Sequence, residues 1–97
     1  MNFVFEVLDK TSRRIHLSKE RWKHIVSKHP YMSSILNDIK NTLTNPDLII
    51  NHKFDDSMRN YYAYYKRKDR YLLVSVKYLN GRGYVATSFI ARKIIRR

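Results

Sequence analysis

The hydrophobic pattern of this chain changes period near residue 47, and that change constrains the fold more than any other feature. Between residues 18 and 44 apolar side chains recur at helical spacing, whereas residues 48–90 alternate in the manner of β-strands. Helices followed by a series of strands are typical of α+β domains, in which the helices cover one face of an antiparallel sheet. The other face is then left for function.

The first half of the chain is expected to hold two helices. Ser18 is a suitable N-cap for the first, and Glu20 lies in its first turn, where negative charge is favourable. Pro30 disfavours helical geometry at His29, so this helix should end near Lys28. The second helix should present one apolar stripe, made of Met32, Ile35, Leu36, Ile39 and Leu43.

Strands are expected on both sides of the helical region. Residues 3–8 and 14–17 are rich in strand-forming side chains, and four further strand segments cover residues 48–52, 59–66, 70–78 and 84–90, with a hairpin signal at Asn80-Gly81. We predict one α+β domain over residues 1–97. Two N-terminal helices pack on one face of a four-stranded antiparallel sheet, to which a short N-terminal β-hairpin could be added. Its parts are a strand segment (1–17), the helices (18–44), the meander (47–90) and a basic tail (91–97) that could form a short helix.

Several classes of protein are disfavoured by composition. The chain has no cysteine, so it can form neither disulfides nor a thiolate site. No segment approaches the roughly 18 apolar residues of a membrane span. The first nine residues lack the basic and then apolar pattern of a secretory signal. We therefore expect a cytoplasmic protein without a membrane partner.

The charge is strongly positive and unevenly distributed. Lys and Arg number 20 against 8 Asp and Glu, a net charge of +12, and residues 57–97 contain eleven basic residues but only one acid, Asp69. Such a field attracts polyanions, of which nucleic acid is the commonest, because binding releases counterions from the phosphates. The charge by itself leaves two other interpretations. The partner could be an acidic protein or a membrane surface, or the charge could serve only solubility.

Strand alternation separates a core face from an open face. Leu72, Val74 and Val76 should meet the helices, which leaves Lys77 on the open face. The parity of the last strand is ambiguous, so either Thr87 or Ser88 joins Lys77. Cations and tyrosines on such a surface suit RNA, although the tyrosines could equally serve sheet packing. The RNA-binding candidates are Arg21, Lys28, Arg59, Tyr62, Tyr64, Lys66, Arg67, Arg82 and Arg92.

Two histidines of the first helix differ in their expected surroundings. His24 lies with Arg21 and Lys28 on the flank of the apolar stripe, which makes it the more available imidazole. His29 lies near the middle of the stripe, where it is either a buried structural histidine or, if exposed, a protonated one at the helix C-terminus. His16 and His52 carry little signal.

A metal site and a small-molecule cofactor are not expected. Asp55 and Asp56 are the only close acid pair, and His24 and His29 are five positions apart, not the four that place two ligands together on a helix. Metal-free RNA cleavage needs less: a base takes the proton of the 2′-hydroxyl, an acid protonates the leaving oxygen, and cations stabilise the phosphorane. Histidine, lysine, arginine and a hydroxyl suffice for this chemistry.

The order of several short motifs resembles the phage-associated barnase–EndoU–colicin–RelE-like (BECR) nucleases. The resemblance covers about residues 14–92 and differs at Tyr31, where that family often has Glu. The first motif consists of residues 15–18 and 22–25, and the second is the segment 28–32, which contains His29-Pro30. Three further motifs follow at residues 45–47, 74–77 and 85–89.

The resemblance implies a metal-independent endoribonuclease of the toxin type, with the same α+β fold. By motif position it implies His24, Lys77 and Thr87 as catalytic candidates, with Arg59 and Lys66 as weaker phosphate contacts. From the residues themselves we add His29 and Ser88 as further catalytic candidates. The expected partners are RNA and an acidic antitoxin or immunity protein. Two alternatives remain: a non-catalytic RNA- or DNA-binding module, and an interaction protein with an acidic partner.

Overall fold

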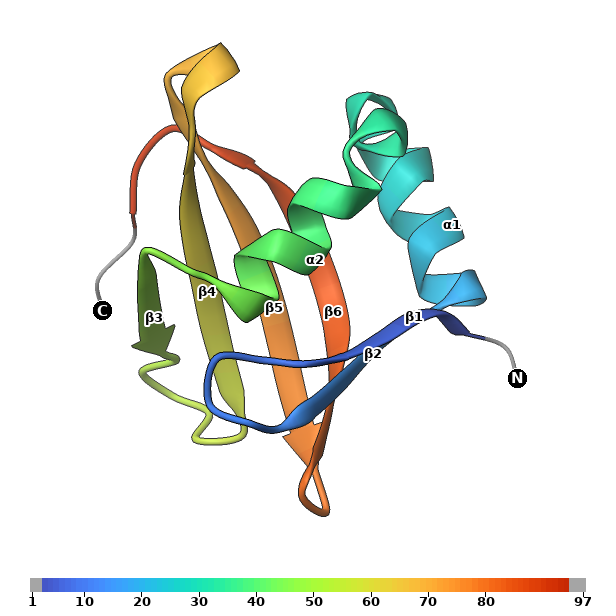
Figure 1. The fold of residues 1–97 in the computed structure, drawn as a ribbon, viewed down its shortest axis with the longest axis vertical. Coiled ribbons are helices and arrows are strands. Elements are labelled where there is room, and N and C mark those ends of the chain that lie inside the picture. Colours follow the sequence, from blue (N-terminus) through green and yellow to red (C-terminus); the bar gives the residue numbers. More distant parts are fainter. Residues whose placement is uncertain (1–2, 95–97) are drawn as a thin grey trace.

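The computed structural model describes residues 3–94 and has an α+β architecture, as predicted (Figure 1). Its strands are β1 (Phe3–Leu8), β2 (Arg14–Ser18), β3 (Leu48–Asn51), β4 (Met58–Tyr65), β5 (Arg70–Leu79) and β6 (Arg82–Ala91). Its helices are α1 (Lys19–Lys28) and α2 (Leu36–Thr44), with short 3-10 helices η1 (Pro30–Ser34) and η2 (Lys66–Lys68). Among the described residues, no helix is long and apolar enough to cross a membrane.

The sheet is larger than the four strands expected. It has six strands in the order β1-β2-β6-β5-β4-β3, and the N-terminal hairpin joins the meander because β2 runs parallel to β6. All other neighbours are antiparallel. The four-stranded prediction was therefore wrong, because a parallel pairing between segments so distant in sequence leaves no local signal. In Figure 1, α2 lies in front of β4 and β5, and α1 lies beside β6.

The first helix follows the prediction, and the second does not. Ser18 caps α1 by accepting a hydrogen bond from the Arg21 N–H at 3.0 Å, and α1 ends at Lys28. The second helix begins only at Leu36, because Ile35 is non-helical at φ −121° and ψ 31°. Met32 instead lies in η1, yet it is still buried in the core. Of the predicted tail, Ala91 ends β6 and residues 92–94 form no helix, and residues 95–97 lie outside the described residues.

The main core lies between the helices and one face of the sheet. Leu72, Val74 and Val76 of β5 are buried there, as predicted, together with Ile25 of α1 and Ile39 of α2. The opposite face, called the open face below, carries a smaller apolar cluster around Tyr62, Leu73 and Ala91. The two faces thus differ in their surroundings, because only the first is covered by helices.

The predicted β5–β6 hairpin turn is confirmed at Asn80-Gly81. Both residues have positive φ values, 53° and 81°, as a type I′ turn requires. This geometry matches the twist of the flanking strands and sets the register of β5 against β6.

Candidate functional site

A row of polar side chains crosses the open face on neighbouring strands. Residues that are register partners in a sheet point to the same face, with Cβ atoms about 5 Å apart. His16 on β2 is the partner of Tyr84 on β6, and Tyr84 is the partner of Lys77 on β5. The row continues to Glu6 on β1 and to Met58 on β4. An acid–base group, a phenol and a cation therefore lie side by side.

His16 is the functional candidate that sequence reasoning missed. Its imidazole packs against the Phe3 ring, with centroids 4.1 Å apart, and lies 6.2 Å from the Tyr84 ring. The sequence did contain a signal, because the apolar residues Ile15 and Leu17 flank His16 and strand alternation places its side chain on the face opposite theirs. Both apolar side chains are fully buried in the structure. What no local pattern offered was the parallel pairing that brings β2 to β6.

A second row of hydroxyl and amide groups runs beside the first. Thr87 is the partner of Ser75, and Ser75 is the partner of Asn60. The register of β6 shifts between the partners of Ser75 and Val76, so Ala86 is an extra residue. Such a bulge reverses the alternation of faces.

The bulge resolves the ambiguity between Thr87 and Ser88. Thr87 joins the face of Lys77, whereas Ser88 turns to the helix side together with its partner Val74. Ser88 is fully buried, and its hydroxyl donates to the Leu73 carbonyl at 2.7 Å. Its hydroxyl is thus engaged within the protein, while the half-buried Thr87 remains accessible from the open face.

Lys77 is held by a carboxylate from the loop between β3 and β4. Its Nζ lies 3.5 Å from Asp55 Oδ2, and both side chains are a little over one third exposed. Asp55 is itself fixed by the Ser57 N–H at 3.0 Å and by the Ser57 hydroxyl. These hydrogen bonds first, and the charge of Lys77 second, lower the pKa of Asp55. The ammonium is therefore oriented before any ligand arrives.

His24 occupies a different place, on the exposed surface of α1. It lines a small hollow with Ser18, Glu20 and Arg21. Among the described residues, no hydrogen bond, ion pair or ring contact joins His24 to Lys77 or Thr87. The structure therefore brings Arg21 and His24 together, but it brings His16, not His24, next to the row that contains Lys77.

His29 lies at the end of α1, half-buried between aromatic rings. Its imidazole stacks on Phe89 at 5.5 Å and meets the edge of Tyr31 at 5.8 Å. Phe89 is the partner of Leu73 and so belongs to the apolar part of the open face. His29 therefore borders the apolar end of this face, whereas His16 belongs to its polar end.

The remaining basic and tyrosine candidates are dispersed. Arg59 is the partner of Val76 and so lies on the helix side, where its guanidinium sits 5.3 Å from the Tyr78 ring. Tyr62 is fully buried and cannot stack on a base, whereas Tyr64 is 49% exposed and donates to Asp69. Lys28, Lys66, Arg67, Arg82 and Arg92 are exposed on α1, η2, β6 and the segment after it.

Candidate ligands for a metal ion do not gather in this structure. Within residues 3–94, no three His, Asp or Glu side chains come close enough to form a metal site. The row itself offers one imidazole, one ammonium and, at its end, the carboxylate of Glu6, which pairs with Arg14 at 3.4 Å. The side chains present are those of proton transfer and phosphate binding.

Comparison with known proteins defines the class of this molecule as a small α+β nuclease. The model of one family, phage-Barnase-EndoU-ColicinE5/D-RelE like nuclease 2, matches residues 5–97. The chain belongs to this family, as the motif order predicted. No curated protein and no solved structure matches the chain.

Proposed function

We propose that this protein is a metal-independent endoribonuclease of the toxin type that cleaves RNA by attack of the 2′-hydroxyl. The observation that carries the proposal is the adjacency of His16, Tyr84 and Lys77 on an open sheet face in a nuclease family member. These groups can transfer protons and stabilise a phosphorane without a metal ion.

The reaction balances with the groups of the two rows. The 2′-oxygen forms a bond to the adjacent phosphorus, and the bond from phosphorus to the 5′-oxygen breaks, which leaves a 2′,3′-cyclic phosphate. One proton passes from the 2′-hydroxyl to a base, and another passes from an acid to the 5′-oxygen. His16 takes one of these roles and the Tyr84 hydroxyl supports the other, while Lys77 holds the phosphate oxygens and Thr87 orients them.

The hollow around His24 is the alternative location for the same chemistry. Arg21 would be its phosphate contact, and Glu20 adds a carboxylate beside the imidazole. We favour the row because it combines an imidazole with Lys77 and with a hydroxyl on adjacent strands, whereas the described residues that line the hollow all belong to α1 or its N-cap and include no lysine.

Cleavage of RNA by purified protein in excess chelator tests the proposal. We expect products with cyclic phosphate ends from RNA and none from DNA of the same sequence. His16→Ala and Lys77→Ala should each lower the rate roughly 100-fold or more, as expected for the loss of an acid–base group or a phosphate contact. His24→Ala should retain most activity, and the reverse pattern would move catalysis to α1. Absence of RNA cleavage would refute the enzymatic proposal.

The toxin role and its partner belong to the same proposal. The protein should act in the cytoplasm, so its expression alone should stop growth of the host cell. His16→Ala should relieve this growth arrest. An acidic antitoxin or immunity protein would neutralise the enzyme by covering the open face, because charge complementarity with a chain of net charge +12 favours such a partner. Growth arrest that persists in His16→Ala would separate toxicity from cleavage.

A further inference from the structure

A series of three neighbouring hollows lies on the helix side of the molecule, away from the two polar rows, and adjacent hollows share lining residues. Tyr31, Lys68 and Ile90 line the first and the second, and Tyr65 lines the second and the third. We call this the helix-side groove. It passes between η1 and η2 and then between α2 and β4.

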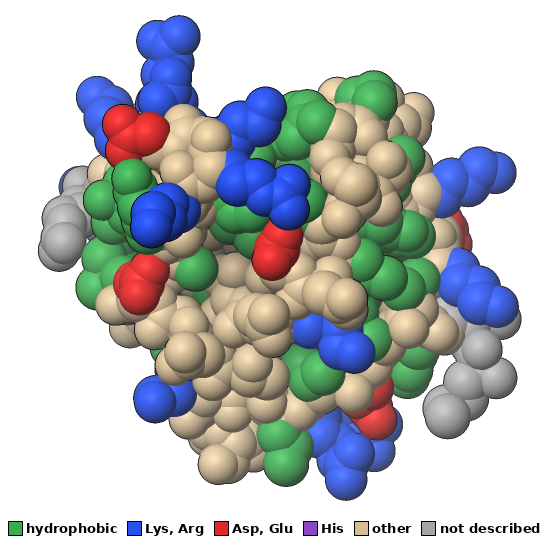
Figure 2. Space-filling model, turned by 45° about the horizontal axis from the view of Figure 1, so that its top comes forward, with side chains coloured by type: hydrophobic (Ala, Val, Ile, Leu, Met, Phe, Trp, Pro, Cys, Tyr) green, Lys and Arg blue, Asp and Glu red, His purple; other side chains and the backbone are tan. Residues whose placement is uncertain are grey.

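One end of the helix-side groove is basic and aromatic. Arg67 and Lys68 line it from the β4–β5 connection, and Arg70 lines it from the start of β5. Figure 2 shows Lys and Arg side chains close together at the upper left, with acidic side chains among them, while other Lys and Arg side chains are spread over the rest of the view. Opposite them, Tyr31 is 46% exposed, and its hydroxyl accepts the Ile90 N–H at 3.3 Å, which fixes the position of the ring.

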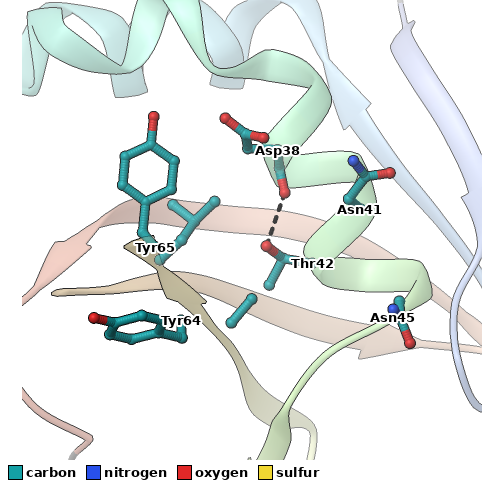
Figure 3. Close-up of a pocket in the computed structure, with 8 residues that line it drawn as sticks. Asp38, Asn41, Thr42, Asn45, Tyr64 and Tyr65 are labelled. Carbon is teal, nitrogen blue, oxygen red and sulfur yellow. Dashed lines mark hydrogen bonds between the residues drawn. The ribbon is translucent and has the colours of Figure 1, made fainter. Parts of the chain in front are cut away.

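The other end of the groove offers hydrogen-bonding groups beside an aromatic ring. Figure 3 shows Asp38 and Asn41 on α2 and Asn45 directly after its end, with the Tyr65 ring across the pocket from Asp38. The Thr42 hydroxyl donates to the backbone carbonyl of Asp38 at 2.8 Å, so it does not engage the carboxylate. Among the described residues, no hydrogen bond or ion pair occupies the Asp38 carboxylate.

We infer that the helix-side groove binds single-stranded RNA that flanks the cleaved bond. Exposed rings stack on unpaired bases, cations hold phosphates, and carboxylate and amide groups read base edges. A duplex would present none of its base faces to Tyr31 or Tyr65, so the occupant is a single strand. The choice of RNA over DNA rests on the proposed ribonuclease function.

The geometry allows one strand to reach both sites. Ile90 in the groove and Tyr84 in the polar row of the open face lie on the same strand, β6, six positions apart. At about 3.3 Å per residue this is roughly 20 Å along the β-strand. Because Ile90 and Tyr84 are on opposite faces of the sheet, a bound RNA strand also has to pass around the end of the sheet, so several nucleotides are needed to join the two sites. The strand would leave the open face over the end of the sheet where β4, β5 and β6 approach η2.

Binding of a fluorescent 2′-O-methyl oligonucleotide, which cannot be cleaved by 2′-hydroxyl attack, tests the groove independently of catalysis. The double variant Arg67→Ala/Lys68→Ala should weaken binding and lower the slope of log affinity against log salt by about 0.7 for each lost phosphate contact. The matched control is Lys19→Ala/Lys23→Ala, which removes the same charge from exposed positions of α1. Equal slopes for the two double variants would overturn the proposal.

Tyr31 separates stacking from a structural role. Tyr31→Phe keeps the ring and should bind like the wild type, whereas Tyr31→Ala should weaken binding roughly 5- to 150-fold. An equal loss of binding affinity in Tyr31→Phe and Tyr31→Ala would assign the effect to the hydrogen bond from the Ile90 N–H and would exclude stacking. Thermal unfolding of both variants identifies any loss that comes from the fold.

Asp38 tests whether the groove reads bases. Asp38→Asn should change the order of affinities among 2′-O-methyl homopolymers, because the carboxylate only accepts hydrogen bonds whereas an amide both donates and accepts. An unchanged order would overturn base reading at this end. If RNA is cleaved through His16 but the Arg67→Ala/Lys68→Ala variant binds as its control does, the groove proposal fails while the proposed function stands. Binding through the groove without cleavage would support the groove and refute the proposed function.

Discussion

Tyr61 on β4 donates a hydrogen bond to the buried carboxylate of Asp9, which lies 52 residues earlier in the β1–β2 turn. The same carboxylate accepts the N–H groups of Thr11 and Arg13 at 2.9 and 2.8 Å, and the Tyr78 hydroxyl at 3.3 Å. This contact ties the N-terminal hairpin to the meander. Because β2 carries His16, it also supports the position of the catalytic candidate.

Tyr61→Phe should lower the free energy of unfolding by about 1.5–3 kcal/mol, the usual range for a hydrogen bond to a charged group. The Tyr61→Phe ring remains in the core, so the change in the free energy of unfolding reports the contribution of the hydroxyl alone. Tyr64→Phe is the matched control, because the Tyr64 hydroxyl also donates to an aspartate, Asp69, but at the exposed surface. Urea unfolding measures both. A loss in Tyr61→Phe no larger than that in Tyr64→Phe would contradict the anchoring role of Asp9.

Stability should also depend on pH through Asp9. Burial alone would raise its pKa, but the hydrogen bonds from Tyr61, Arg13 and Thr11 outweigh burial and lower the pKa below 3.8. A lowered folded-state pKa contributes stability that is complete above the unfolded value and is lost as the pH falls through the folded value. The wild type should therefore lose more stability than Asp9→Asn between about pH 4 and pH 2. Parallel curves for the two proteins in this range would refute the linkage.

Local signals predicted most of the elements, although not the start of α2 at Leu36, and a non-local contact explains the error in the sheet. The Ser18 cap, the end of α1 before Pro30 and the turn at Asn80-Gly81 each depend on a few adjacent residues. The parallel pairing of β2 with β6 joins segments whose sequences contain no sign of each other.

The candidate site was predictable only where alternation is regular. Lys77 follows directly from the pattern of its own strand. Assigning His16 to the site required knowing that β2 pairs with β6. Choosing between Thr87 and Ser88 required knowing the bulge at Ala86, which is not marked by a residue typical of turns. Arg59 was expected to contact phosphate together with Lys77, although alternation left its face open; its register with Val76 places it on the other side of the sheet from Lys77.

Asp55→Asn should lower both kcat and KM for RNA. The Asp55 carboxylate orients the Lys77 ammonium, and it also competes with the RNA phosphate for that ammonium. Removing the carboxylate charge therefore strengthens phosphate binding, which lowers KM, but leaves the ammonium less well oriented, which lowers kcat. Steady-state cleavage of an oligonucleotide measures both constants. Asp56→Asn, an exposed neighbour without such a contact to Lys77, is the control. An increase in KM would contradict the competition between Asp55 and the phosphate.

Thr87 and Ser88 offer the sharpest contrast between function and stability, because the bulge turns these adjacent hydroxyls to opposite faces. Thr87→Val removes a hydroxyl from the row beside Lys77 and should lower cleavage at least tenfold, with little change in unfolding. Ser88→Ala removes a buried hydrogen bond to the Leu73 carbonyl and should cost about 1 kcal/mol of stability, with nearly normal cleavage of the folded protein. Cleavage rates and urea midpoints measured on the same preparations separate the two effects. If Ser88→Ala lost activity while Thr87→Val kept it, the catalytic face would be the helix side, and the assignment of the open face would fail.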